Sequence, residues 1–84
     1  MNEQTVYLVK FDRGYYAKVQ PNYNWSFTDD PYLATQYKTM NKAKERGDWG
    51  LSLTSGFPIA VNDVKSYIIE KYTVKTILEL KNDS

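Results

Sequence analysis

Two adjacent carboxylates, Asp29 and Asp30, are the residues in this sequence whose types and spacing come closest to acid–base or metal chemistry. A divalent cation would need several more oxygen ligands at defined spacing, and the neighbouring residues do not supply them. Pro31 follows at once, and Asp before Pro is typical of a helix start. The carboxylate can accept hydrogen bonds from the free N–H groups there. The pair therefore predicts a helix cap, with no metal site.

Catalytic chemistry is limited because the chain has no histidine and no cysteine. These residues supply the commonest general base, the commonest metal ligand and the thiolate nucleophile. Ser52, Thr54 and Ser55 therefore have no histidine partner, and no motif supports a serine–lysine pair. Gly47 and Gly50 lack the spacing of a phosphate-binding loop. We predict a protein that is not an enzyme and that uses no cofactor.

Basic residues cluster at Lys38, Lys42, Lys44 and Arg46. Lys42 and Arg46 are four residues apart, so they share one face of a helix, and Lys38 lies one turn further back. Two interpretations stay open. Such charges ordinarily form a solvated helix face, and the functional alternative is a patch that contacts nucleic-acid phosphates. The net charge of +1 argues against a generally basic nucleic-acid binder.

Aromatic residues make up 15% of the chain, and eight of them are tyrosines. In a small domain such rings supply much buried area per residue, so most should lie in the core. Three are expected outside it. Tyr16 faces away from the predicted inner residues, Tyr23 lies in a turn, and Tyr32 lies at a helix start. Exposed tyrosines are common in binding hot spots, so these three predict a protein partner or self-association as a homodimer.

The length of 84 residues predicts a single domain, residues 1–84. No apolar run approaches the roughly 18 residues that cross a membrane. The first ten residues, MNEQTVYLVK, lack the basic start and apolar stretch of a signal peptide. We therefore expect a cytoplasmic protein with no membrane partner.

The first third of the chain has the pattern of an antiparallel hairpin and a third strand. Residues 5–11 alternate, with the odd positions Tyr7, Val9 and Phe11 predicted to face the core. Residues 12–14, Asp-Arg-Gly, form the turn, residues 15–20 return as the second strand, and residues 25–28 form the third.

Two short helices are predicted next, over residues 31–36 and 40–46. Asp30 caps the first, Thr39 caps the second, and Gly47 ends it. Helices of this length are not stable alone in water, so both must pack against the sheet.

The remainder of the chain is less regular. Residues 49–63 predict a short strand and a loop. For residues 64–80 two alternatives remain. The β-branched residues of the second half favour one long strand, whereas Val64, Ile68 and Tyr72 have helical spacing.

The order of these elements resembles small uncharacterised proteins encoded by phages and prophages of Gram-positive bacteria. Those proteins carry a tyrosine-rich hairpin, an aromatic-Thr-x-Asp…Ala…aromatic segment and a second helix that contains Ala. The matching positions, within residues 5–47, are Tyr15, Tyr16, Trp25, Thr28, Asp30, Ala34, Tyr37, Thr39 and Ala43. The resemblance implies a small α+β domain made in a bacterial cytoplasm, and it implies no activity.

These observations predict an α+β fold. A small antiparallel sheet would contain the N-terminal hairpin, the third short strand and the C-terminal strand, with the two short helices on one face. The leading functional hypothesis is a non-enzymatic protein-interaction module that modulates a host protein or self-associates. The alternative is nucleic-acid binding through the four basic residues.

Overall fold

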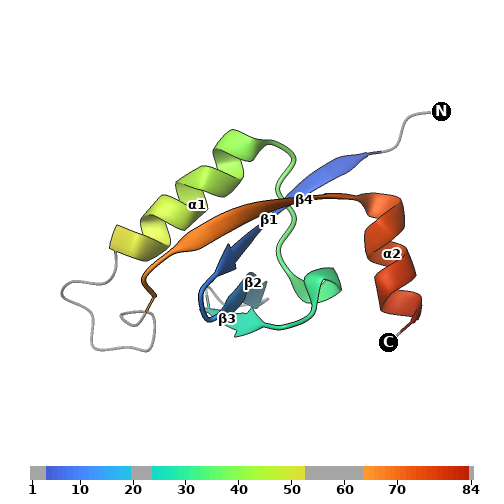
Figure 1. The fold of residues 1–84 in the computed structure, drawn as a ribbon, viewed down its shortest axis with the longest axis horizontal. Coiled ribbons are helices and arrows are strands. Elements are labelled where there is room, and N and C mark those ends of the chain that lie inside the picture. Colours follow the sequence, from blue (N-terminus) through green and yellow to red (C-terminus); the bar gives the residue numbers. More distant parts are fainter. Residues whose placement is uncertain (1–3, 20–23, 53–63, 84) are drawn as a thin grey trace.

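A computed structural model describes residues 4–19, 24–52 and 64–83 (Figure 1). The strands are β1 (Thr5–Phe11), β2 (Gly14–Val19), β3 (Asn24–Thr28) and β4 (Tyr67–Thr73). They form one antiparallel sheet in the order β3-β2-β1-β4. The helices are the short 3₁₀ helix η1 (Pro31–Leu33) and the α-helices α1 (Met40–Ser52) and α2 (Val74–Asn82). The α+β fold and its antiparallel sheet, built from the predicted strands, are confirmed.

The hairpin of β1 and β2 closes through a tight turn at Asp12 and Arg13, with Phe11 paired to Gly14. Gly14 has a φ of 132°, a conformation that other residues rarely adopt. This is the turn chemistry that the Asp-Arg-Gly sequence predicts. On its other side β1 pairs with β4 along its whole length, from Thr5 opposite Thr73 to Phe11 opposite Tyr67.

Beyond the turn, residues 35–37 hydrogen-bond to both β1 and β2. β1 and β2 pair directly with each other only next to the turn, where Lys10 pairs with Tyr15 and Phe11 with Gly14. The Thr35 N–H donates to the Tyr16 carbonyl of β2 at 3.0 Å. Tyr37 exchanges two backbone hydrogen bonds with Tyr7 of β1, at 2.8 and 2.9 Å. We call residues 35–37 the crossing segment, because they carry the chain from one face of the sheet to the other.

The crossing segment explains why helices cover both faces of the sheet (Figure 1). One face packs against α1, in a cluster of Val9, Phe11, Tyr16, Ala43 and Val64. The other face packs against η1 and α2, in a cluster of Val6, Leu8, Tyr15, Ala34 and Ile77. Both alternating sets of β1 are therefore buried, and Leu8 and Val9 are each 0% exposed. We predicted both short helices on one face of the sheet. This placement is wrong, because α1 and η1 lie on opposite faces.

The two predicted helices also differ in length from expectation. The first is only the 3₁₀ turn η1, and the Asp30 carboxylate makes no capping hydrogen bond. The Asp30 carbonyl accepts from the Leu33 N–H instead, at 3.0 Å. The second helix begins as predicted, with the Thr39 hydroxyl accepting from the Lys42 N–H at 3.2 Å.

Gly47 does not end α1, which continues through it and through Gly50 to Ser52. The strand predicted from Trp49 is therefore helix as far as residue 52, and the rest of that prediction lies outside the described residues. Both glycines lie where α1 approaches rings of the sheet. A Cβ atom on Gly47 would lie 2.4 Å from Cε1 of Tyr67, and one on Gly50 would lie 2.4 Å from Cζ of Phe11. The glycines thus allow close packing of helix on sheet.

The C-terminal segment contains both structures that the sequence left open. The strand alternative is correct for β4 and wrong beyond Thr73, and the helix alternative is wrong for β4 itself. Thr73 ends the strand because its hydroxyl accepts from the Thr76 N–H at 3.1 Å, as a helix N-cap. Ile77 then packs into the core, so capping and burial outweigh the β preference of this segment.

Replacing Thr73 with alanine should lower the free energy of unfolding by about 1 kcal/mol, because the Thr76 N–H loses its acceptor. Urea unfolding followed by circular dichroism measures the change. The variant Thr73→Ser keeps the hydroxyl and should stay close to wild type. Equal stability of wild type and Thr73→Ala would show that this cap does not hold α2.

Candidate functional site

The tyrosines predicted to form an exposed patch do not lie on one surface. Tyr16 is only 4% exposed, and its ring meets Trp49 edge-on at 6.3 Å beneath α1. Its predicted exposure is wrong, because the hairpin register puts Tyr16 on the same face as Val9 and Phe11, which α1 covers. Tyr32 is partly buried against the core cluster on the opposite face. Tyr23 lies outside the described residues.

The four basic residues are divided among different surroundings. Lys38, Lys42 and Lys44 are exposed, whereas Arg46 is partly buried. Lys42 and Arg46 line a concavity of about 300 Å³, together with Tyr37, Glu45 and Trp49. Lys38 lines a separate concavity, and Lys44 lines neither. Of the four basic residues predicted to form a patch, two therefore line this concavity, Lys42 and Arg46.

Arg46 is held in place mainly by aromatic rings. The carbon at the centre of its guanidinium lies 4.6 Å from the centre of the Trp49 ring and 5.2 Å from that of the Tyr16 ring. Such cation–π contacts are stronger where water is partly excluded. Burial raises the pKa of Tyr37, and a hydrogen bond with Arg46 opposes this rise. The Tyr37 hydroxyl is therefore protonated at neutral pH. We call Tyr37, Lys42 and Arg46 the cationic site.

A second polar group lies on the face of η1 and α2. The hydroxyls of Tyr15 and Tyr72 both donate to the Glu70 carboxylate, the latter at 3.0 Å. Burial raises the pKa of Tyr15 strongly, and the hydrogen bond to Glu70 raises it further. Tyr15 is therefore a fixed donor rather than a base at neutral pH. Lys10 places its Nζ 5.2 Å from the centre of the Tyr15 ring.

Sequence reasoning missed this tyrosine–glutamate cluster, although a signal existed. Glu70 lies between Ile68 and Tyr72 on one face of the predicted strand, so a charged residue interrupts an otherwise apolar alternation. Leu8 lies opposite Glu70 on β1 and is fully buried, which places the carboxylate beside the core. Such a residue is expected to have hydrogen-bond partners.

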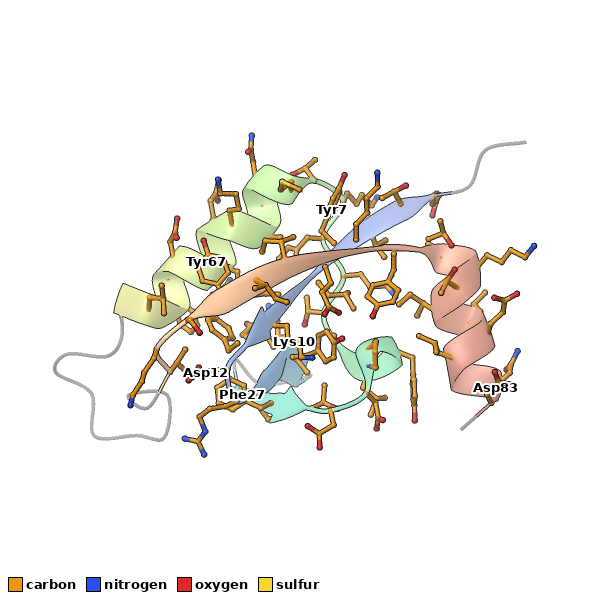
Figure 2. All side chains as sticks on the ribbon, viewed as in Figure 1. Tyr7, Lys10, Asp12, Phe27, Tyr67 and Asp83 are labelled. Atoms are coloured by element: carbon orange, nitrogen blue, oxygen red, sulfur yellow. The ribbon has the colours of Figure 1, made fainter. Side chains whose placement is uncertain are left out.

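Large apolar side chains remain exposed on the elements that form or cover this second face. Leu33 of η1, Ile68 of β4 and Leu78 of α2 are 56%, 56% and 54% exposed. We call these three the exposed apolar set. Ile68 lies opposite Lys10 in the register, so it shares the face of Leu8 and of the tyrosine–glutamate cluster. Figure 2 shows Lys10 on the side of β1 toward η1, and Tyr67 between α1 and β4.

The outer edge of β4 faces away from the other strands of the described sheet. Asp12 donates its N–H to the Ser66 carbonyl, and Val74 donates its N–H to the Gln4 carbonyl. These two bonds fix the alternation of the antiparallel pair. The N–H and C=O groups of the even-numbered residues of β4 bond to β1, and those of the odd-numbered residues point away from β1. Because β4 is the last strand of the sheet, no strand among the described residues pairs with this edge.

Within the described residues, no group of three or more histidine, cysteine, aspartate or glutamate side chains could hold a metal ion. In the same part of the chain, no helix is long and apolar enough to span a membrane. Comparison of the chain with protein-family models, curated proteins and solved structures found no match.

Proposed function

We propose that this protein is a non-enzymatic protein-interaction module that binds its partner with the exposed apolar set and the outer edge of β4. The observation that carries the proposal is that Leu33, Ile68 and Leu78 each remain more than half exposed. A chain of 84 residues has few large apolar side chains with which to build its core. Leu33 and Leu78 lie on elements that contact each other, η1 and α2, and apolar side chains left together in water are typical of an interaction surface.

The neighbouring groups suit a binding surface that is ordered before the partner arrives. Hydrogen bonds to Glu70 hold the Tyr15 and Tyr72 side chains, so little side-chain freedom remains to be lost on binding. The outward N–H and C=O groups of β4 can pair with an extended segment of the partner. Alternate side chains of that added strand would lie beside Ile68 and extend the apolar contact.

The non-enzymatic part of the proposal is supported by residue chemistry. The chain lacks histidine and cysteine, and the raised pKa of Tyr15 makes that residue a poor base or nucleophile. The resemblance of residues 5–47 to phage and prophage proteins supports a partner in the cytoplasm of a bacterial host cell. A second copy of the chain, forming a homodimer, would use the same surface.

Two measurements on purified protein test this proposal. Sedimentation over a range of concentrations reports self-association, and affinity capture from bacterial lysate reports other partners. Ile68→Lys should abolish whichever association the wild type shows, because it places a charge in the apolar contact. Met40→Lys is the matched control, because Met40 is 48% exposed but belongs to α1.

The proposal fails if the wild type is monomeric and captures the same proteins as Ile68→Lys. It also fails if Met40→Lys reduces association as much as Ile68→Lys does. Circular dichroism of each variant confirms that the fold is intact. Exposed positions such as these ordinarily tolerate substitution within about 0.5 kcal/mol.

A further inference from the structure

We propose that the cationic site, formed by Tyr37, Lys42 and Arg46, binds a phosphate group. The site lies where the crossing segment meets α1, in the concavity of about 300 Å³ that Glu45 and Trp49 also line. It is separate from the exposed apolar set, which belongs to η1, β4 and α2. The proposal is therefore independent of the protein-interaction function.

Arg46 offers hydrogen-bond donors to a ligand in the concavity. The carbon at the centre of its guanidinium lies over the Trp49 ring at 4.6 Å and over the Tyr16 ring at 5.2 Å. Contacts with ring faces occupy no hydrogen-bond acceptor, so N–H groups of the guanidinium remain available to an oxyanion. They also fix the orientation of the group, so less freedom is lost when a ligand binds.

Tyr37 offers a further donor at the same concavity. Arg46 opposes the rise that burial causes in the pKa of Tyr37, and because arginine has only donors it faces the phenolic oxygen as an acceptor. Because burial raises the pKa of Tyr37, the phenol also keeps its own proton at neutral pH. That proton can be donated to a ligand in the concavity. Arg46 and Tyr37 therefore present donors at the same site.

The charges around Arg46 favour an anionic ligand. Among the described residues, no carboxylate forms an ion pair with Arg46 or Lys42. A cation that is partly removed from water without a counter-ion favours an anionic ligand. Lys42 is one turn before Arg46 on α1 and adds a second positive charge. Glu45 opposes them with one negative charge, so the concavity keeps a net charge of +1 and favours an anion.

These donors fit phosphate better than carboxylate. A guanidinium, an ammonium group and a phenol can share the several acceptor oxygens of a phosphate group, whereas a carboxylate offers only two. The concavity also has room for the atoms attached to the phosphate. The phosphate could belong to a free nucleotide or to a single-stranded nucleic acid, since the site recognises the chemistry that both share.

Nuclear magnetic resonance titration of the isotope-labelled protein tests the site, with three probes at low salt: inorganic phosphate, a nucleoside monophosphate and a short oligothymidylate. Amide signals of α1 and the Arg46 Nε–H signal should shift on binding. Arg46→Lys keeps the charge but loses the planar donors, and it should weaken binding about tenfold or more. Lys42→Gln should also weaken binding. Lys44→Gln is the matched control, because it removes the same charge from α1 outside the concavity.

The probes separate the two sources of phosphate. Similar affinity for the monophosphate and the oligonucleotide supports a free phosphate compound, whereas much tighter and more salt-sensitive binding of the oligonucleotide supports a nucleic-acid strand. No shift at millimolar concentrations of any probe would overturn the proposal. So would equal weakening by Lys42→Gln and Lys44→Gln, or equal affinity for an acidic peptide that lacks phosphate. If Arg46→Lys does not fold, the exposed Lys42 decides the outcome.

Discussion

Replacing Gly50 with alanine should lower the free energy of unfolding by about 2–3 kcal/mol, the upper part of the range for an overpacked core. In an exposed helix the same change would stabilise by up to about 1 kcal/mol, because alanine is the better helix former. Here the new Cβ would lie 2.4 Å from Cζ of Phe11, whose ring is buried in the core cluster. The helix or the ring must therefore shift. Urea unfolding at neutral pH measures the loss.

Two further variants show whether the loss comes from this contact. Gly47→Ala should cost less, because the Tyr67 ring that it meets is only partly buried and can move. In the double variant Phe11→Leu/Gly50→Ala, the leucine lacks the ring atoms that the Cβ of residue 50 would meet. The loss of stability in the double variant should therefore be smaller than the sum of the losses in the two single variants. If Gly50→Ala is as stable as wild type, or more so, α1 does not pack as closely on the sheet as described.

Alkaline pH should destabilise the protein through Tyr15. Burial and the hydrogen bond to Glu70 raise the pKa of Tyr15 above its ordinary value of 10.0. Above that pH the unfolded chain releases the Tyr15 proton while the folded chain keeps it. The stability contributed by this group is therefore complete below pH 10 and falls as the pH rises further, by at most about 1.4 kcal/mol per pH unit. Urea unfolding at a series of pH values measures this slope.

The variant Tyr15→Phe isolates the contribution of the hydroxyl. At neutral pH it should lower the free energy of unfolding by about 2 kcal/mol, the usual range for a hydrogen bond to a charged group. Above pH 10 its stability should fall less steeply than that of wild type. Tyr67→Phe is the comparison, because the Tyr67 hydroxyl donates to Asp48 at 2.7 Å near the surface and should contribute less. Parallel slopes for wild type and Tyr15→Phe would contradict the assignment.

Local signals in the sequence were sufficient to predict the sheet. The Asp-Arg-Gly turn and the Thr39 cap each depend on a few neighbouring residues, and each is present in the structure. The alternation of β1 predicted the strand but only one of its two buried faces. The placement of the helices could not be predicted in the same way. It depends on the pairing of Tyr37 with Tyr7, which lie far apart in the sequence and carry no shared pattern. Gly47 has the local signal of a helix end, but its packing against Tyr67 decides its role.

The cationic site was only partly predictable. Helical spacing predicted that Lys42 and Arg46 share one face of a helix, and the structure places both in one concavity. Trp49 joins them because α1 continues past Gly47, and Tyr37 joins them through the crossing segment. The expectation for Tyr16 failed because alternation within β2 does not show which of its two sets of side chains shares the face of Val9 and Phe11, and because both faces of the sheet are covered.

The crossing segment has a consequence for how the chain reaches its native state. A hairpin isolated from the rest of the chain would be expected to zip along its full length, since each added pair closes only a small loop. Full zipping would occupy the backbone groups of Tyr7 and Tyr16 that residues 35–37 use in the native structure. The completely zipped hairpin is thus a misfolded competitor that would exclude residues 35–37. Productive folding requires those residues to be captured while the two strands are still apart.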